Sequence, residues 1–548
     1  MHPTSTAPSK PSFLTRIFRW LFSWKTLRRA IMAVVVLFTL LAAYFTIERY
    51  RGRRAWEAFK MEMAAKGEKL SLQEILPPLP PDAENFAATP LLRPLLRYHY
   101  TNTPPKNPAA LVTLNTVTNQ PPPGTPPQGG PGPDLRNPNL IWEDARAVQR
   151  VQGIDMFLKS AKGVNVPSWG SSIKGQPTDL APWSKFYVGN TNYPQAATNA
   201  NPGTVMLTAL SKYKAELDEV REASKRPRSV FDLHFDESMD AMLPQLSVMK
   251  NLTVLARMSA VAHLAKGELP QAFEDVKLAF RIADSLREQP ILVSQLVRVA
   301  CLAIAVDAAW EGLSKQAWSD AQLRELQDLA ASFDLLKDYG STIRGERAFS
   351  NQFMEQLIRG RLGAAAFMGD TGRHLLKIGP EGWLYQNQIL INRTHQDYSL
   401  PVIDAAAQRA YPQRGRELDD FILNMRTTPY TALARMLFPA FSKTAAKMTR
   451  SHTTLRFLQI ACALERYRLA NSEIPADLAA LSPQFIPALP NDPIDAKPIR
   501  YRKETKQSYT LYSIGWDEKD DNGQPVGFKT KPPIAEREDG DWIWKLSQ

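Results

Sequence analysis

The chain has 548 residues, of which 44 % are hydrophobic, and a formal net charge of +12. This length exceeds what one hydrophobic core supports, so we expect two or more folded parts. The positive charge is concentrated near the N-terminus, because residues 1–54 contain ten Lys and Arg residues against a single acidic residue, Glu48. The rest of the chain is nearly balanced, which argues against nucleic acid as a partner.

Residues 30–47 form a long apolar run without a charged residue. A run of about 18 residues reaches the lower limit for a helix that crosses the hydrocarbon core of a bilayer. It ends in Tyr44, Phe45 and Thr46 rather than in the small residues of a signal-peptide cleavage site, so we expect a retained transmembrane helix. Basic residues flank the run on both sides. They favour contact with membrane lipid, but they do not decide the topology.

The segments around this run differ in composition. Residues 1–29 place aromatic and aliphatic side chains at helical spacing among basic residues, which predicts a basic amphipathic segment. Residues 48–102 predict a juxtamembrane helix followed by an extended segment, because prolines end the helix. Residues 103–139 are rich in Pro and Gly and lack periodicity, which indicates a linker or surface loop.

Residues 140–450 show mainly helical periodicity and predict a domain built of αα-hairpins. Gly267 and Pro270 mark the end of one helix and the start of the next. The small residues of this pair are weakly similar to a TPR hairpin, but one unit does not make a repeat array. The fold class is therefore mainly α.

Two cysteines, Cys301 and Cys462, lie inside apolar helical patterns. Neither has a His or Cys at the spacing of a metal site. We expect both to be unreactive thiols in the core.

One catalytic fragment occurs in the chain, because Ser171 and Lys174 fit the S-x-x-K pattern in which a lysine deprotonates a serine. The supporting S-D-N and K-T-G elements are absent, and the neighbouring Gly and Pro residues disfavour a helix. A hydrolase that uses this pair or an unrecognised active site in the helical domain is the alternative function.

The sequence pattern changes near residue 451. Residues 451–548 predict an α+β module, in which one long helix lies on a small antiparallel sheet. Ser451 is the expected N-cap of the long helix, and Asp477 the start of a short one. The stretches PIRYR and SYTLYSIG are expected to form a β-hairpin.

This module resembles the C-terminal domain of the major pseudopilin of type II secretion systems, and the similar tails of many bacterial envelope proteins. The resemblance is carried by ALERYRLANSEIPADLAAL, LPNDPIDAKPIRYR and YTLYSIGWDEKDDNG, in the same order. In that family the acidic loop binds calcium through carboxylate and carbonyl oxygens, the ligands that Ca²⁺ prefers. The resemblance implies these metal ligands: Asp517, Asp520, Asp521 and Asp541. An acidic loop that is solvated and binds no metal is the other interpretation.

The chain departs from the family in Trp516 and Lys519, and its apolar run lacks the glutamate found near the processing site of pseudopilins. We therefore do not expect a filament subunit. The resemblance implies a bacterial inner-membrane protein with a single pass, the N-terminus inside and the bulk of the chain in the periplasm. The expected function is non-enzymatic, a structural or protein-interaction role, with secretion machinery among the candidate partners.

Overall fold

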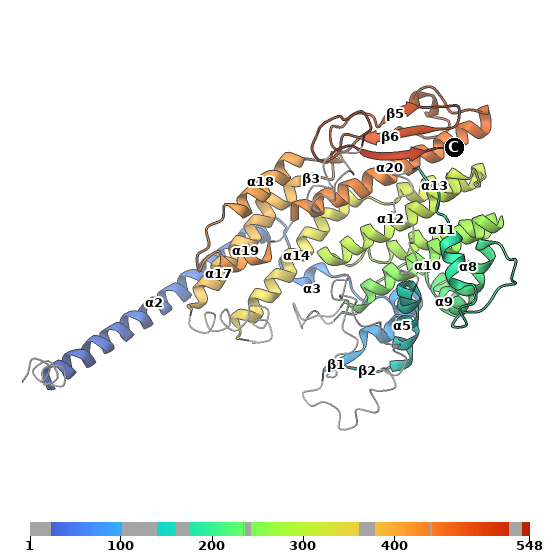
Figure 1. Ribbon diagram of the computed structural model, residues 1–548. Coiled ribbons are helices and arrows are strands. Elements are labelled where there is room, and N and C mark those ends of the chain that lie inside the picture. Colours follow the sequence, from blue (N-terminus) through green and yellow to red (C-terminus); the bar gives the residue numbers. More distant parts are fainter. Residues whose placement is uncertain are drawn as a thin grey trace, which may run out of the picture. The chain divides into compact units, whose positions relative to one another are not determined.

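The computed structural model describes residues 24–100, 140–160, 175–233, 235, 243–360, 379–438, 441–524 and 540–547 (Figure 1). The mainly helical class is confirmed within these residues. The predicted amphipathic segment up to residue 23, the Pro/Gly-rich residues 103–139 and the pair Ser171 and Lys174 lie outside them.

The chain divides into two compact units, each made of segments that are far apart in sequence. The first unit contains Met1–Glu68, Met354–Leu390 and Arg426–Ala434. The second unit contains the remaining segments: Lys69–Phe353, Ile391–Met425 and Arg435–Gln548. Residues 451–548 thus belong to the same compact unit as the helical hairpins, and the predicted boundaries between domains stay a prediction.

Helix α2 (Trp24–Ala65) joins the predicted span and the juxtamembrane helix in one element of 42 residues. None of the residues in its apolar window is buried. Beyond the apolar run, residues spaced three or four apart are buried and form a stripe: Glu48, Gly52, Trp56, Phe59 and Met63. The helix is long and apolar enough to span a membrane, and its second half packs on folded polypeptide.

The first turns of α17 (Glu381–Thr394) cross α2 with the two backbones in contact. A Cβ atom on Gly382 would lie 2.2 Å from the carbonyl oxygen of Glu48, and one on Gly52 would lie 2.7 Å from the Cα of Gly382. This crossing requires glycine on both helices, because any side chain would meet backbone atoms.

The second unit begins with short elements. Strands β1 (Tyr98–Tyr100) and β2 (Leu140–Trp142) pair antiparallel. The other elements in this part are helices and 3₁₀ turns: α3 (Leu72–Ile75), η1 (Asp82–Glu84), η2 (Phe86–Ala88), η3 (Arg93–Leu96), α5 (Ala145–Ser160), α7 (Ala181–Tyr187), α8 (Pro202–Leu210), η5 (Ser211–Tyr213) and α9 (Lys214–Ala223).

Three long helices form the centre of the second unit: α10 (Pro244–Lys266), α11 (Leu269–Asp284) and α12 (Leu292–Ser314). Each packs against the other two. Helix α10 ends at Gly267 in the left-handed conformation, and Pro270 lies in the first turn of α11, as the sequence predicts. Helix α12 is also long and apolar enough to cross a membrane, but 61 % of its apolar window is buried, as in a core helix.

Helices α13 (Asp320–Ala331) and α18 (Pro412–Leu423) extend this unit, whereas α14 (Leu335–Ile358) and α19 (Ala432–Leu437) contain residues of both units. Ser319 and Gln322 form a capping box at the start of α13. Helix α17 continues into a π-helical turn, η7 (His395–Ser399), and the 3₁₀ turn η8 (Leu400–Val402). Strands β3 (Ile403–Asp404) and β4 (Arg409–Ala410) form a two-stranded pair.

The core near these helices contains buried polar side chains. Asn351 and Asn392 exchange two hydrogen bonds between their amides, of 3.1 and 2.6 Å. His395 is 1 % exposed, and burial lowers its pKa to about 3. His452 is 5 % exposed, and burial lowers its pKa well below the usual value. Neither ring nitrogen of His452 has a hydrogen-bond partner in the described part of the chain.

The chain ends in a three-stranded antiparallel sheet of order β5-β6-β7, which packs on helix α20 (Figure 1). The elements are α20 (Phe441–Asn471), η9 (Leu478–Leu481), β5 (Arg500–Lys503), β6 (Tyr509–Ser513) and β7 (Trp542–Leu546). The predicted hairpin is confirmed, with Arg500 opposite Tyr512 and Lys503 opposite Tyr509. Asp477 caps η9 as expected. The prediction for Ser451 is wrong, because α20 already begins at Phe441 and Ser451 lies inside it.

Candidate functional site

The acidic end of the terminal sheet brings together two groups of carboxylates that the sequence separates. The first surrounds Arg500 at the start of β5, and the second joins the two ends of the segment between β6 and β7. Both lie within residues 451–548, which the sequence predicts to be a pseudopilin-like module with a calcium-binding loop.

Asp492 is the buried centre of the first group. Its side chain is fully buried and accepts hydrogen bonds from the backbone nitrogens of Ile494, at 3.0 Å, and Ile514, at 3.3 Å. These bonds tie the loop before β5 to the end of β6. Burial raises the pKa of Asp492, even though these backbone hydrogen bonds favour its charged form.

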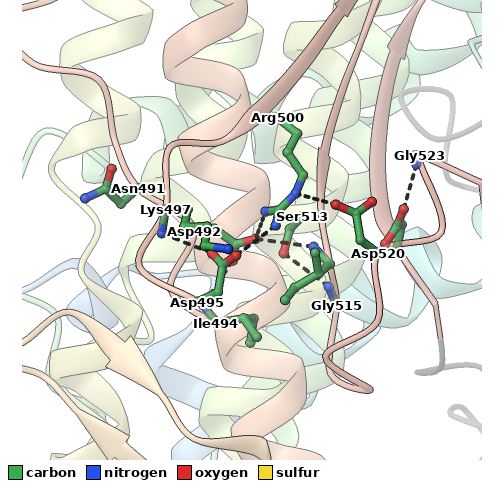
Figure 2. A network of polar contacts seen from close by, with 12 residues as sticks. Asn491, Asp492, Ile494, Asp495, Lys497, Arg500, Ser513, Gly515, Asp520 and Gly523 are labelled. Atoms are coloured by element: carbon green, nitrogen blue, oxygen red, sulfur yellow. Dashed lines mark hydrogen bonds and ion pairs between the residues drawn. The ribbon is translucent and has the colours of Figure 1, made fainter.

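Arg500 binds three carboxylates at once, as Figure 2 shows. Its Nη1 lies 3.3 Å from Asp492, its Nη2 lies 2.8 Å from Asp495, and its Nε lies 2.9 Å from Asp520. A guanidinium group presents donors in a rigid planar fork, which suits several carboxylates around one cation. The arginine therefore supplies the positive charge that this group of acids requires.

The second group is a reciprocal pair of hydrogen bonds across the base of the loop after β6. The carboxylate of Asp517 accepts from the backbone nitrogen of Gly540, at 3.1 Å. The carboxylate of Asp541 accepts from the backbone nitrogen of Gly523, at 2.6 Å. Each end of the loop thus carries an acid that holds the other end. We call these four residues the loop clamp.

The clamp is tight because the backbones at its base touch. A Cβ atom on Gly515, which has a φ of +69°, would lie 2.1 Å from the carbonyl oxygen of Gly540. Glycine is required there for both its conformation and its lack of a side chain.

One carboxylate oxygen of Asp541 accepts a hydrogen bond, and the other has no partner among the described residues. Oδ2 accepts from Gly523, and the Asp521 backbone also donates to this carboxylate. Oδ1 is buried without a hydrogen-bond partner in the described residues. Burial raises the pKa of Asp541, and the nearby charges of Asp520 and Asp521 raise it further. A cation bound at Oδ1 would offset the cost of this buried charge.

The four expected calcium ligands make different contacts in the structure. Asp517 and Asp541 belong to the loop clamp, Asp520 is bound to Arg500, and Asp521 contributes a backbone donor to Asp541. No group of three or more His, Cys, Asp or Glu side chains is placed to hold a metal ion among the described residues. The segment 525–539, which carries three further acids in the sequence, lies outside them.

Sequence reasoning missed Arg500, Asp492 and Asp495. The available signal was the pair Arg500 and Arg502 between the N-D-P loop and the acidic loop, since arginines close to several acids commonly pair with them. It also missed the contact of Gly382 with α2, for which the sequence carries no local signal.

The terminal module is fixed to the helices of its own unit by polar contacts as well as by packing. Trp310 Nε1 donates to the carbonyl oxygen of Lys545, at 2.8 Å, and Arg466 Nε lies 2.9 Å from Asp320. These contacts cover the face of the module that meets α12 and α13.

Comparisons of the chain with protein-family models, with curated protein sequences and with solved structures found no match. The resemblance to pseudopilins therefore depends on the residues of 451–548 alone and stays a prediction.

Proposed function

We propose that the chain is a single-pass protein of the bacterial inner membrane with a structural or protein-interaction role. Helix α2 is the anchor, the N-terminus lies in the cytoplasm, and the bulk of the chain lies in the periplasm. The partners are membrane lipid and other proteins, with secretion machinery as the candidate. The orientation follows from the resemblance of residues 451–548 to pseudopilins, whose modules work outside the cytoplasmic membrane.

The observation that carries this proposal is the change of burial along α2. The apolar run up to Ile47 contains no buried residue, whereas Glu48 is only 6 % exposed. Exposed apolar side chains over a length of about 27 Å match the hydrocarbon core of a bilayer. The uninterrupted helix then links the membrane to the folded part without a flexible joint.

An alkaline extraction experiment tests the anchor. The full-length protein should stay in the membrane pellet after carbonate treatment, and a variant that lacks residues 1–47 should be released. Release of the intact full-length protein would contradict the proposal. A mature protein that starts after residue 47 would contradict it as well.

A calcium-binding role for the loop clamp is a second proposal, and the buried Oδ1 of Asp541 favours it. Asp517 and Asp541 are the described side chains that would bind the ion, whereas Asp520 is already bound to Arg500. Calcium requires six to eight oxygen ligands, so main-chain oxygens and further residues of the loop would have to contribute. If calcium binds, adding a chelator should lower the Tm of the full-length protein, and Asp541→Asn should abolish this shift. A Tm that is identical with calcium and with chelator would refute this second proposal.

The hydrolase alternative has one supporting feature, a cavity of about 290 Å³ in the second unit. Its lining is apolar except for Glu346, whose pKa is raised by burial. A raised pKa suits a general acid, but acid–base catalysis requires a second group within reach of the substrate. Loss of a measured hydrolytic activity in Glu346→Gln would favour the alternative.

A further inference from the structure

A band of four arginines follows the apolar run of α2 directly. Because the α-helix rises 1.5 Å per residue, these residues occupy about 8 Å along the axis. The buried stripe takes one side of the helix, and the arginine side chains occupy the others: Arg49, Arg51, Arg53 and Arg54. Arg49 and Arg51 remain 63 and 58 % exposed, although each has an acidic partner.

Acidic residues of the first unit lie beside the arginines of α2. Glu381 at the start of α17 lies 3.0 Å from Arg49, and Glu48 lies 3.1 Å from Arg51. These two acids neutralise two of the four arginines. Within the described residues no ion pair is formed by Arg53 or Arg54, and both side chains are exposed, so they provide the excess charge.

Aromatic side chains lie beside this band. The guanidinium of Arg51 stands 5.9 Å from the centre of the Tyr430 ring, and the ring of Trp383 meets that of Tyr430 at 6.2 Å. Tyr44, inside the last turn of the apolar run, is in hydrogen-bonding contact with Tyr430. Tyr and Trp rings are enriched where hydrocarbon meets headgroups. Charge and aromatic content thus both indicate the level of the lipid headgroups.

We propose that this collar, defined as the four arginines with Trp383 and Tyr430, binds the phosphate headgroups of anionic phospholipids. The inference rests on the proposed function, because the apolar run must lie in the bilayer. It goes further by assigning a lipid class and the two residues that select it, Arg53 and Arg54. An arginine near an anionic membrane surface strengthens binding by about fivefold.

The experiment is a lipid titration of the full-length protein in detergent, followed by native mass spectrometry. Phosphatidylglycerol and phosphatidylcholine with identical acyl chains are the probes. The wild type should retain phosphatidylglycerol in preference to phosphatidylcholine. The double variant R53Q/R54Q should bind phosphatidylglycerol roughly 20-fold more weakly, with no change for phosphatidylcholine. Raised salt should weaken only the binding of phosphatidylglycerol.

The matched control is K60Q/K66Q, which removes the same charge from the same helix further from the apolar run. Lys60 and Lys66 pair with Glu57 and Glu62, so we expect wild-type selectivity. Equal affinity of the wild type for both lipids would overturn the inference, and so would equal losses in both double variants. Release of the wild type by carbonate would instead refute the anchor. The two failures are therefore distinguishable.

Discussion

The backbone of Gly382 lies on that of Glu48, so closely that a Cβ on Gly382 would come within 2.2 Å of the Glu48 carbonyl oxygen. Glu48 is the first residue after the apolar run, and its side chain is buried. Folded polypeptide therefore begins at the residue where the apolar run ends. Any rotation or sliding of α2 against α17 would break this contact.

Adding one methyl group at this crossing should destabilise the first unit. Gly382→Ala is expected to lower the free energy of unfolding by about 1–3 kcal/mol, because the methyl group meets backbone that cannot yield. Native-state hydrogen exchange of the amides in α17 measures this effect. The control is Gly153→Ala in α5, where a Cβ would meet only the Tyr213 ring, at 3.4 Å. That variant should be neutral or more stable by about 0.5–1 kcal/mol. Unchanged exchange in Gly382→Ala would show that the crossing is not tight.

Removing the guanidinium of Arg500 should destabilise the second unit, because the carboxylates around it lose their cation. Arg500→Met leaves the fully buried Asp492 without its cation, a loss of about 3–5 kcal/mol at neutral pH. The pKa of Asp492 is raised in the folded state, so its contribution to stability improves as the pH falls through that pKa towards the usual value of an aspartate. Loss of the neighbouring cation should raise the pKa of Asp492 further than in the wild type. The deficit of the variant should therefore shrink on acidification. Urea denaturation at several pH values measures it, and a deficit that grows at low pH would contradict this assignment.

The loop clamp should contribute to stability through Asp541. Asp541→Ala leaves the Gly523 backbone nitrogen without its acceptor, which should cost about 1–3 kcal/mol. Limited proteolysis of the loop after β6 should become faster at the same time. Glu518→Ala serves as the control, because the exposed Glu518 side chain forms an ion pair with Arg416 that is worth about 0–1 kcal/mol. Equal stability of the two variants would argue against the clamp.

Acid should destabilise the second unit through its buried histidines. The folded-state pKa of His395 is about 3, and that of His452 is also lowered, so the unfolded chain binds more protons than the folded chain below pH 6.5. Stability should fall as the pH decreases from 6.5, by about 1.4 kcal/mol per pH unit for each histidine. His452→Leu should reduce this slope and should keep or raise stability at pH 7.5. Denaturation midpoints between pH 7.5 and 4.5 test this, and an unaltered slope would contradict it.

Local signals allowed part of the fold to be predicted. Gly267 and Pro270 place the junction of α10 and α11 correctly, because a left-handed cap and a missing amide hydrogen act within a few residues. The strands around Arg500 and Tyr509 follow from alternation and a short turn. The prediction that Ser451 caps the long helix is wrong, because a capping residue also fits inside a helix when the preceding residues are good helix formers.

The site could be predicted only in part, because its geometry depends on contacts between distant segments. Asp517 and Asp541 are two of the four metal ligands that the resemblance implies, yet their hydrogen-bond partners Gly540 and Gly523 come from the opposite end of the loop. Glu48 lies against Gly382, more than three hundred residues away in the chain. No periodicity or motif encodes such a contact.

Cysteine labelling in spheroplasts with an intact inner membrane tests the proposed topology most directly. The native thiols give a clean background, because Cys301 and Cys462 are buried and burial raises the pKa of both, that of Cys301 to about 11. Single cysteines are introduced by Lys506→Cys, in the exposed turn between β5 and β6, and by Ser9→Cys near the N-terminus. An impermeant maleimide should label Lys506→Cys at once and Ser9→Cys only after permeabilisation. Labelling in the opposite order would contradict the proposal that α2 anchors an exported protein.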